Sequence, residues 1–209
     1  MQLEEYIENH ISPEPELLRQ VYHDTYLHRL YPQMCSGHYQ GRLLVMLTRM
    51  IRPRRILELG AFSGYSALCF AEGMPEGAEI HTVEIDDEAA ESLQQTFAKS
   101  PRAADIHLHI GDALDLIPRL DGPWDMVFID ANKRHYTDYY NLVMPHVSPG
   151  GYILADNTLW GDKVLHPQDS HDAQSQAIFS FNDMIAADPR VEKVILPIRD
   201  GMTIIRKIP

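Results

Sequence analysis

The stretch "WDMVFIDANKRHYTDYYNLV", residues 124–143, sets the architecture of the chain. It begins with a short apolar run that ends abruptly at Asp130, as a buried strand does. From Tyr136 onward the residues predict a helix. A buried strand followed at once by a helix is the unit of a parallel sheet covered by helices.

The same alternation extends along the whole chain in both directions. Strands are predicted over residues 54–60, 78–86, 105–112, 124–130, 150–157, 192–198 and 202–208. Helices are predicted over residues 4–11, 15–29, 39–51, 63–74, 87–100, 113–120, 136–147 and 173–188. This order indicates an α/β fold with a doubly wound, mostly parallel sheet of seven strands and helices on both faces. The three residues 199–201 are too few for a parallel crossover, so we expect the last strand to run antiparallel.

Composition predicts one soluble domain. The chain has 209 residues, 44% of them hydrophobic and 23% charged, which suits a single globular core. Its net charge of −12 disfavours partners that are polyanions, such as nucleic acids. Cys35 and Cys69 lack CxxC spacing, so neither a disulfide framework nor a zinc ribbon is expected. We find no secretory leader and no apolar run of about 20 residues, and we expect a cytoplasmic protein that does not enter a membrane.

Three strand ends offer polar groups that suit a nucleoside. The first is "ELGAFSGYS" (58–66), in which Gly60 and Gly64 frame a tight turn into a helix. It lacks the middle glycine of GxGxxG, which makes a dinucleotide the weaker interpretation. Glu84 ends the next strand, 20 residues after Gly64, and Asp112 ends the third. Each acid, taken alone, is explained more simply as a solvated residue that ends a strand than as a ligand. Together they predict an acidic pocket, and S-adenosylmethionine, a cationic nucleoside derivative, fits it.

The next two strand ends carry oxygen ligands. Asp130 follows one strand, and Asp156 and Asn157 end the other. Neighbouring residues of a strand point to opposite faces, so Asp156 and Asn157 converge only if the chain turns there. Two carboxylates and one amide oxygen suit Mg²⁺, or another divalent cation such as Ca²⁺ or Mn²⁺. The alternative is that Asp and Asn only terminate strands. The pocket beside them favours the metal site.

Other catalytic motifs are missing from the sequence. It has no GxSxG of a serine hydrolase and no GxxxxGK[ST] of a nucleotide hydrolase. Its eleven histidines include no HxxxH or HExxH, so we interpret them as surface or structural groups rather than zinc ligands. A substrate contact by His38 or His135 stays open.

Five ordered motifs resemble the divalent-metal-dependent class I O-methyltransferases, the group containing catechol and caffeoyl-CoA O-methyltransferases. The motifs are "ILELGAFSGYSAL" (56–68), "HTVEID" (81–86), "GDA" (111–113), "VFIDANKRHY" (127–136) and "LADNTLWGDKV" (154–164). The resemblance runs from about Met34 to the end of the chain. It implies a Rossmann-like methyltransferase domain spanning residues 1–209, with the helical segment 1–50 helping to cover the active site. A homodimer is implied only by this resemblance.

The resemblance also implies roles for individual residues. The cofactor S-adenosylmethionine would contact Ser36, Glu58, Gly60, Ala61, Ser66, Glu84, Asp112, Ala113 and Asp130. The metal ligands would be Asp130, Asp156 and Asn157, and the catalytic base would be Lys133. Asn132 departs from the family, which often has an acid there, but Asn132 is neither the ligand nor the base.

The implied reaction is methyl transfer to one hydroxyl of a metal-chelated vicinal diol, such as a catechol or a caffeoyl compound. A phenolic hydroxyl has a pKa near 10, and a bound cation lowers it. Lys133 would then take the proton, although a strand-end surface lysine is the alternative. Met34 and Trp160 either form walls of the substrate slot or belong to the core. A second function stays open, methylation of a hydroxylated wobble uridine in tRNA, which the net charge disfavours.

Overall fold

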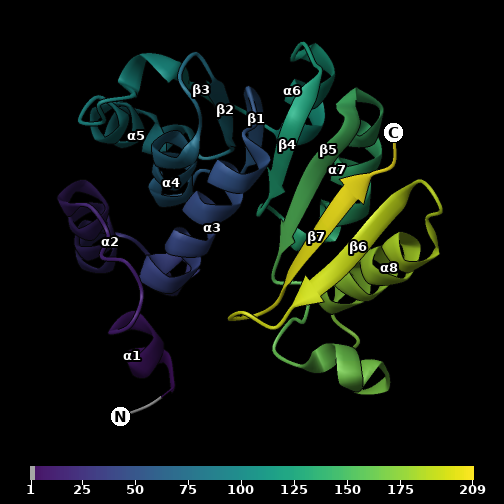
Figure 1. Cartoon of the computed structure of the whole chain (residues 1–209). Coiled ribbons are helices and arrows are strands. Elements are labelled where there is room, and N and C mark those ends of the chain that lie inside the picture. Colours follow the sequence, from purple (N-terminus) through teal and green to yellow (C-terminus); the bar gives the residue numbers. More distant parts are fainter. Residues whose placement is uncertain (1–2) are drawn as a thin grey trace.

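The computed structural model describes residues 3–209. These residues form one sheet of seven strands with helices on both faces (Figure 1). The strands are β1 (Arg55–Leu59), β2 (Glu79–Glu84), β3 (Ile106–Ile110), β4 (Trp124–Ile129), β5 (Val147–Asp156), β6 (Val191–Leu196) and β7 (Met202–Lys207). Their order in the sheet is β3-β2-β1-β4-β5-β7-β6. Strands β1 to β5 pair in parallel, and β7 runs antiparallel to both β5 and β6. The predicted fold class and the reversed last strand are confirmed.

The helices fall into two layers because apolar side chains line both faces of the sheet. The α-helices are α1 (Leu3–Glu8), α2 (Glu16–His28), α3 (Gly37–Ile51), α4 (Tyr65–Gly73), α5 (Ala90–Phe97), α6 (Ala113–Leu116), α7 (Tyr136–Val143) and α8 (Ala173–Ala187). Helices α2, α3, α4 and α5 contribute buried side chains to the core on one face of the sheet. Helices α6, α7 and α8 build the core on the other face.

The chain reverses its direction of winding between β1 and β4. From β1 it proceeds outward to β2 and β3, and it then returns so that β4 lies on the other side of β1. In doubly wound sheets, ligands bind at the carboxyl ends of the strands at this reversal. The fold therefore directs attention to the residues that follow β1 and β4.

The connection from β6 to β7 is longer than expected. The last pair of the hairpin joins Leu196 to Met202, so five residues, 197–201, form the link rather than three. Within it, the Gly201 amide donates to the Ile198 carbonyl and closes a turn, which withdraws Ile198 from the strand. The link is still far too short for a parallel crossover.

None of the helices within residues 3–209 combines the length and apolar character that a membrane span requires.

Candidate functional site

A cavity of about 780 Å³ lies where five strands end. Gly60 follows β1, Glu84 ends β2, Asp112 follows β3, Asp130 follows β4 and Asp156 ends β5. Ten of the residues predicted for the site line this cavity: Met34, Gly60, Glu84, Asp112, Ala113, Asp130, Lys133, Asp156, Asn157 and Trp160. Residues far apart in sequence thus share one wall, because parallel strands bring their carboxyl ends together.

Gly60 allows β1 and β4 to approach each other at the reversal. Its φ is +101°, and a Cβ built there would lie 2.2 Å from the carbonyl oxygen of Asp130. Any side chain at this position would therefore push Asp130 away from the cavity. The same glycine that opens the turn toward α4 also sets the position of a predicted metal ligand.

The acidic side chains on the cofactor side are held by backbone amides. Glu84 accepts hydrogen bonds from the amides of Phe62 (2.7 Å) and Asp86 (3.0 Å). Asp112 caps α6 by accepting from the Leu114 amide (2.9 Å). Both carboxylates have a defined orientation at the cavity and retain acceptor capacity, since each carboxylate oxygen has two lone pairs.

The other four residues predicted to contact the cofactor do not line this cavity. Glu58, Ala61 and Ser66 are buried within the strand, turn and helix beneath it. Ser36 lines a neighbouring cavity of about 500 Å³, to which His38 also contributes. Contact of these four with a cofactor stays a prediction.

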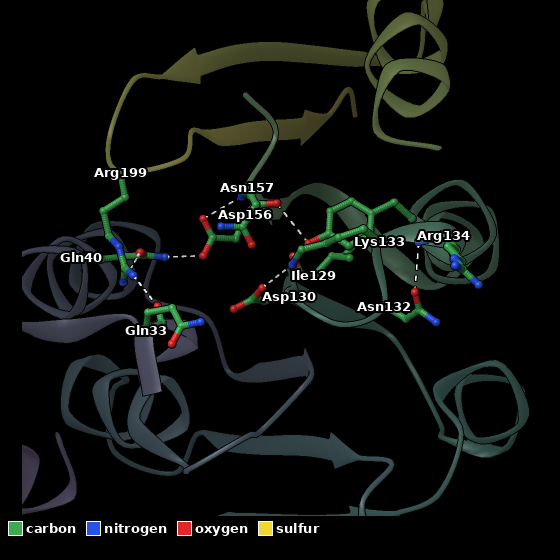
Figure 2. Close-up of polar contacts among 11 residues, drawn as sticks. Gln33, Gln40, Ile129, Asp130, Asn132, Lys133, Arg134, Asp156, Asn157 and Arg199 are labelled. Carbon is green, nitrogen blue, oxygen red and sulfur yellow. Dashed lines mark hydrogen bonds and ion pairs between the residues drawn. The ribbon is translucent and has the colours of Figure 1, made fainter. Parts of the chain in front are cut away.

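Asp130, Asp156 and Asn157 converge from the adjacent strands β4 and β5 (Figure 2). The chain turns where the sequence required it to, since Asn157 has a φ of +58°. Asparagine tolerates this left-handed conformation better than most residues. The turn lets Asn157 face the same cavity as Asp156 although the two are neighbours in sequence.

Lys133 links the end of β4 to α7. Its Nζ donates to Asp130 Oδ1 (2.7 Å) and to the Tyr136 hydroxyl (2.8 Å). Tyr136 in turn lies within donating distance of the carbonyls of Ile129 and Asp156. Lys133 is therefore not a solvated surface lysine, because its ammonium group is nearly buried between β4 and α7.

The electrostatics of this corner favour a cation. Burial, and then the charge of Asp130, raises the pKa of Asp156 to about 6. Burial opposes the charge of Lys133, but the carboxylates of Asp130 and Asp156 outweigh it and raise the Lys133 pKa. The two carboxylates carry more negative charge than one ammonium group compensates. This excess negative charge and the all-oxygen donor set fit a divalent cation such as Mg²⁺.

Sequence reasoning missed two residues that support this corner, Gln40 and Arg199 (Figure 2). Gln40, buried in α3, donates to Asp156 Oδ2 (2.7 Å) and accepts from Arg199 Nη1 (3.3 Å). Arg199 also donates to the backbone carbonyls of Gln33, Cys35 and Ser36. No local pattern marks Gln40, since α3 also contains the polar residues Arg42 and Arg49. No local pattern marks Arg199.

Met34 and Trp160 both belong to the cavity lining. Met34 is 54% exposed, so it is a wall residue and not part of the core. Trp160 packs partly against the α7 and α8 core, and its Nε1 donates to Ser175 Oγ (2.9 Å). Asn132 also lines the cavity, and it accepts from the Arg134 amide and caps the short turn at Lys133.

Comparisons with known proteins lead to one family. The family model described as "O-methyltransferase" matches residues 8–208. Caffeoyl-CoA O-methyltransferase 1 of Eucalyptus globulus is 32% identical over 97% of this chain and 86% of its own length. The catechol O-methyltransferase of Niastella koreensis is 33% identical over 79% of this chain and 76% of its own length.

A solved structure has the same fold throughout. The O-methyltransferase TomG from Streptomyces achromogenes, described as in complex with SAM, superposes with a TM-score of 0.90. It is 30% identical, and the alignment covers 100% of both chains. A family match over almost the entire chain, with relatives above 30% identity, leaves no other placement: this chain belongs to the O-methyltransferase family, with the caffeoyl-CoA and catechol enzymes among its relatives.

Proposed function

We propose that this chain transfers a methyl group from S-adenosylmethionine to one hydroxyl of a vicinal diol on a small aromatic molecule, held by a divalent cation at Asp130, Asp156 and Asn157. The coarser class, an S-adenosylmethionine-dependent O-methyltransferase of the caffeoyl-CoA or catechol type, follows from the family. The diol, the cation and the residue roles are the proposal.

One observation supports the proposal most directly. Asp130, Asp156 and Asn157 present only oxygen ligands at one corner of the cavity, and Lys133 lies 2.7 Å from the first of them. A base within hydrogen-bonding reach of a metal-binding corner is what deprotonation of a chelated hydroxyl requires. The methyl donor S-adenosylmethionine would occupy the other side of the cavity, where the carboxylates of Glu84 and Asp112 can accept hydrogen bonds from ribose hydroxyls and the adenine amine.

The cation, when bound, would lower the pKa of the chelated hydroxyl and fix which oxygen faces the methyl group. Lys133 holds a proton at Nζ because Asp130 is charged beside it. A cation bound at this carboxylate would compensate its negative charge. Lys133 would then be able to lose its proton and, as a neutral amine, accept the hydroxyl proton. The new C–O bond forms as the S–CH₃ bond breaks, which leaves S-adenosylhomocysteine and a methyl ether.

Positioning supplies much of the rate of such a displacement, because the oxygen, the methyl carbon and the sulfur must lie in line. Met34 and Trp160 line the cavity and would hold the aromatic ring between them. The tRNA alternative is not favoured, since the relatives are named for small-molecule acceptors and the chain carries a net charge of −12.

The test is methyl transfer from labelled S-adenosylmethionine to a panel of catechols and caffeoyl compounds, with and without EDTA. We expect turnover that disappears with the chelator and returns when Mg²⁺ is added in excess. Asp156→Ala should lose both the activity and its metal dependence. Turnover that persists in EDTA would contradict the role of the cation, while a panel with no acceptor would contradict the diol.

A further inference from the structure

A cluster of three histidines and one glutamate lies along β2 and β3, and none of its members lines the cavity. Glu79 and His81 alternate along β2 and so share a face of the sheet. His107 and His109 alternate along β3, and the parallel register pairs His81 with His107. Ring contacts of His81 with both β3 histidines and with Trp124 place the cluster on the face covered by α6 and α7.

The side-chain atoms are spaced as metal ligands are. The Nε2 of His81 lies 3.3 Å from Glu79 Oε1, and the Nε2 of His107 lies 3.4 Å from Glu79 Oε2. Each of the three residues offers a ligand atom within 4.8 Å of the other two. Ligands about 2.0 to 2.1 Å from a tetrahedral zinc ion lie about 3.3 to 3.4 Å from one another. The two separations, which end on different oxygens of Glu79, are of the size expected between neighbouring ligands.

His81 has a nitrogen that the protein leaves unused. Among residues 3–209, its Nε2 is buried and has no hydrogen-bond partner, although it faces Glu79. Its Nδ1 lies 2.9 Å from Nε2 of His109, and the two rings stack at an interplanar angle of 8°. When Nδ1 of His81 donates to His109, its Nε2 presents a lone pair toward Glu79, as in a histidine oriented for a metal.

A neighbouring positive charge already partners Glu79 and leaves one of its carboxylate oxygens for an ion. Arg55 Nε donates to Glu79 Oε1 (2.8 Å) while its guanidinium lies over the Trp124 ring. This bond orients the carboxylate, and Oε2 is left toward His107.

We infer that Glu79, His81 and His107 form a second metal site, suited to a transition-metal ion such as Zn²⁺, with His109 orienting His81. Two imidazoles and one carboxylate make a borderline-soft donor set, unlike the all-oxygen corner of the cavity. His107 is 41% exposed, which leaves the fourth position open to water. The ion would join the edge strand β3 to β2.

The experiment is a calorimetric titration of the metal-stripped full chain with Zn²⁺ in excess Mg²⁺, which occupies the oxygen site. We expect one Zn²⁺ per chain, and a loss of affinity of more than about tenfold in His107→Ala and in Glu79→Gln. His107 is partly exposed, so its replacement should leave the fold intact, which a thermal melt checks. His23→Ala, which removes another exposed histidine, should bind Zn²⁺ as the parent does.

Two results would overturn the second site. No Zn²⁺ binding by the parent in Mg²⁺ would make the histidines a polar cluster only. Loss of the Zn²⁺ signal in Asp156→Ala, with the signal retained in His107→Ala, would assign the ion to the catalytic corner. Co²⁺ gives an independent reading, since a visible spectrum typical of nitrogen ligands should appear in the parent and vanish in His107→Ala.

Discussion

The proposed reaction depends on the protonation state of Lys133. Lys133→Ala should slow turnover by about 10² to 10⁴-fold, the usual contribution of a general base. Affinity for S-adenosylmethionine should stay within about twofold, because Lys133 contacts the metal corner. Affinity for Mg²⁺ should not fall, since a positive charge beside Asp130 is removed.

Steady-state kinetics and equilibrium binding of the cofactor separate these effects. The control is Lys99→Ala, which removes an exposed lysine outside the main cavity and should leave both quantities unchanged. A large loss of cofactor affinity in Lys133→Ala would make Lys133 a structural residue rather than a base.

Gln40 acts on the metal corner through a neighbour. It is 1% exposed, and its amide joins Asp156 to Arg199. Gln40→Ala frees the Asp156 carboxylate to rotate, so we expect Mg²⁺ affinity to fall by about 10 to 100-fold, as for other residues that orient a metal ligand. Calorimetry with Mg²⁺ measures this directly.

Gln33→Ala is the matched control for Gln40. Gln33 meets Arg199 through its backbone carbonyl, which the substitution keeps, so Mg²⁺ affinity should not change. Equal Mg²⁺ affinity in Gln40→Ala and the parent would show that Asp156 is oriented without Gln40.

Glu58 links pH to stability. Burial raises the pKa of Glu58 to about 7, and its Oε1 has no hydrogen-bond partner within the part of the chain that the structure describes. With an ordinary pKa of 4.5 when unfolded, the folded chain holds one more proton between the two values. The stability supplied by Glu58 is therefore complete below pH 4.5 and is lost as pH rises through 7.

Urea denaturation at several pH values tests this linkage. Between pH 4.5 and 7 the parent should lose on the order of 3 kcal/mol through Glu58, and Glu58→Gln should lack that slope. Glu76→Gln, at an exposed glutamate, should keep it. Identical slopes in the parent and in Glu58→Gln would show that Glu58 is ionised in the folded chain.

At the level of elements, the strand ends could be predicted because each carries a local signal. The apolar run of β4 stops at Asp130, and Lys133 follows three residues later. The turn after β5 was also predictable, since Asp156 and Asn157 cannot face one cavity without it. Alternation along the sequence predicted a parallel sheet, which places these strand ends along one edge. The order of the strands within the sheet comes from the structure.

What could not be predicted depends on contacts between distant segments. Arg199 contacts Gln33, 166 positions away, and nothing near either residue indicates the pairing. The histidines showed no ligand spacing because Glu79 and His81 lie on β2 and His107 on β3, and only the register joins them. Local periodicity predicts an element but not which side chains of two elements meet.

The turn after β1 is the element whose geometry is tested most simply. Gly60→Ala places a Cβ against the Asp130 carbonyl and keeps a φ of +101°, so we expect a loss of about 2 kcal/mol or more. Gly77 also has a positive φ (+74°), but a Cβ there meets nothing within 4 Å. Gly77→Ala should therefore cost only about 1 kcal/mol.

Denaturant unfolding of the two variants measures the difference. Because Gly60 also positions Asp130, Gly60→Ala should weaken Mg²⁺ binding, whereas Gly77→Ala should not. Equal stability of the two variants would show that β1 and β4 can separate at the reversal without cost.

The molecule as a whole places different chemistry in two regions of one sheet. The carboxyl ends of β1 to β5 carry the cavity, and the histidine cluster lies along β2 and β3 outside it. The division into a single domain with a covering segment over residues 1–50 stays a prediction, although Gln33 and Met34 do line the cavity. The homodimer also stays a prediction, which sedimentation of the purified chain would check.

Arg199 connects the amino-terminal part of the chain to its carboxyl-terminal part at one wall of the cavity. Its guanidinium holds the carbonyls of Gln33, Cys35 and Ser36, and through Gln40 it reaches Asp156 (Figure 2). On the ribosome, strands β1 to β5 can pair while synthesis continues, but this wall of the cavity cannot form before residue 199 has emerged. The nascent chain can therefore pair β1 to β5 before the corner at Asp156 is organised, while β7, which follows Arg199 in the sequence, joins the sheet only afterwards.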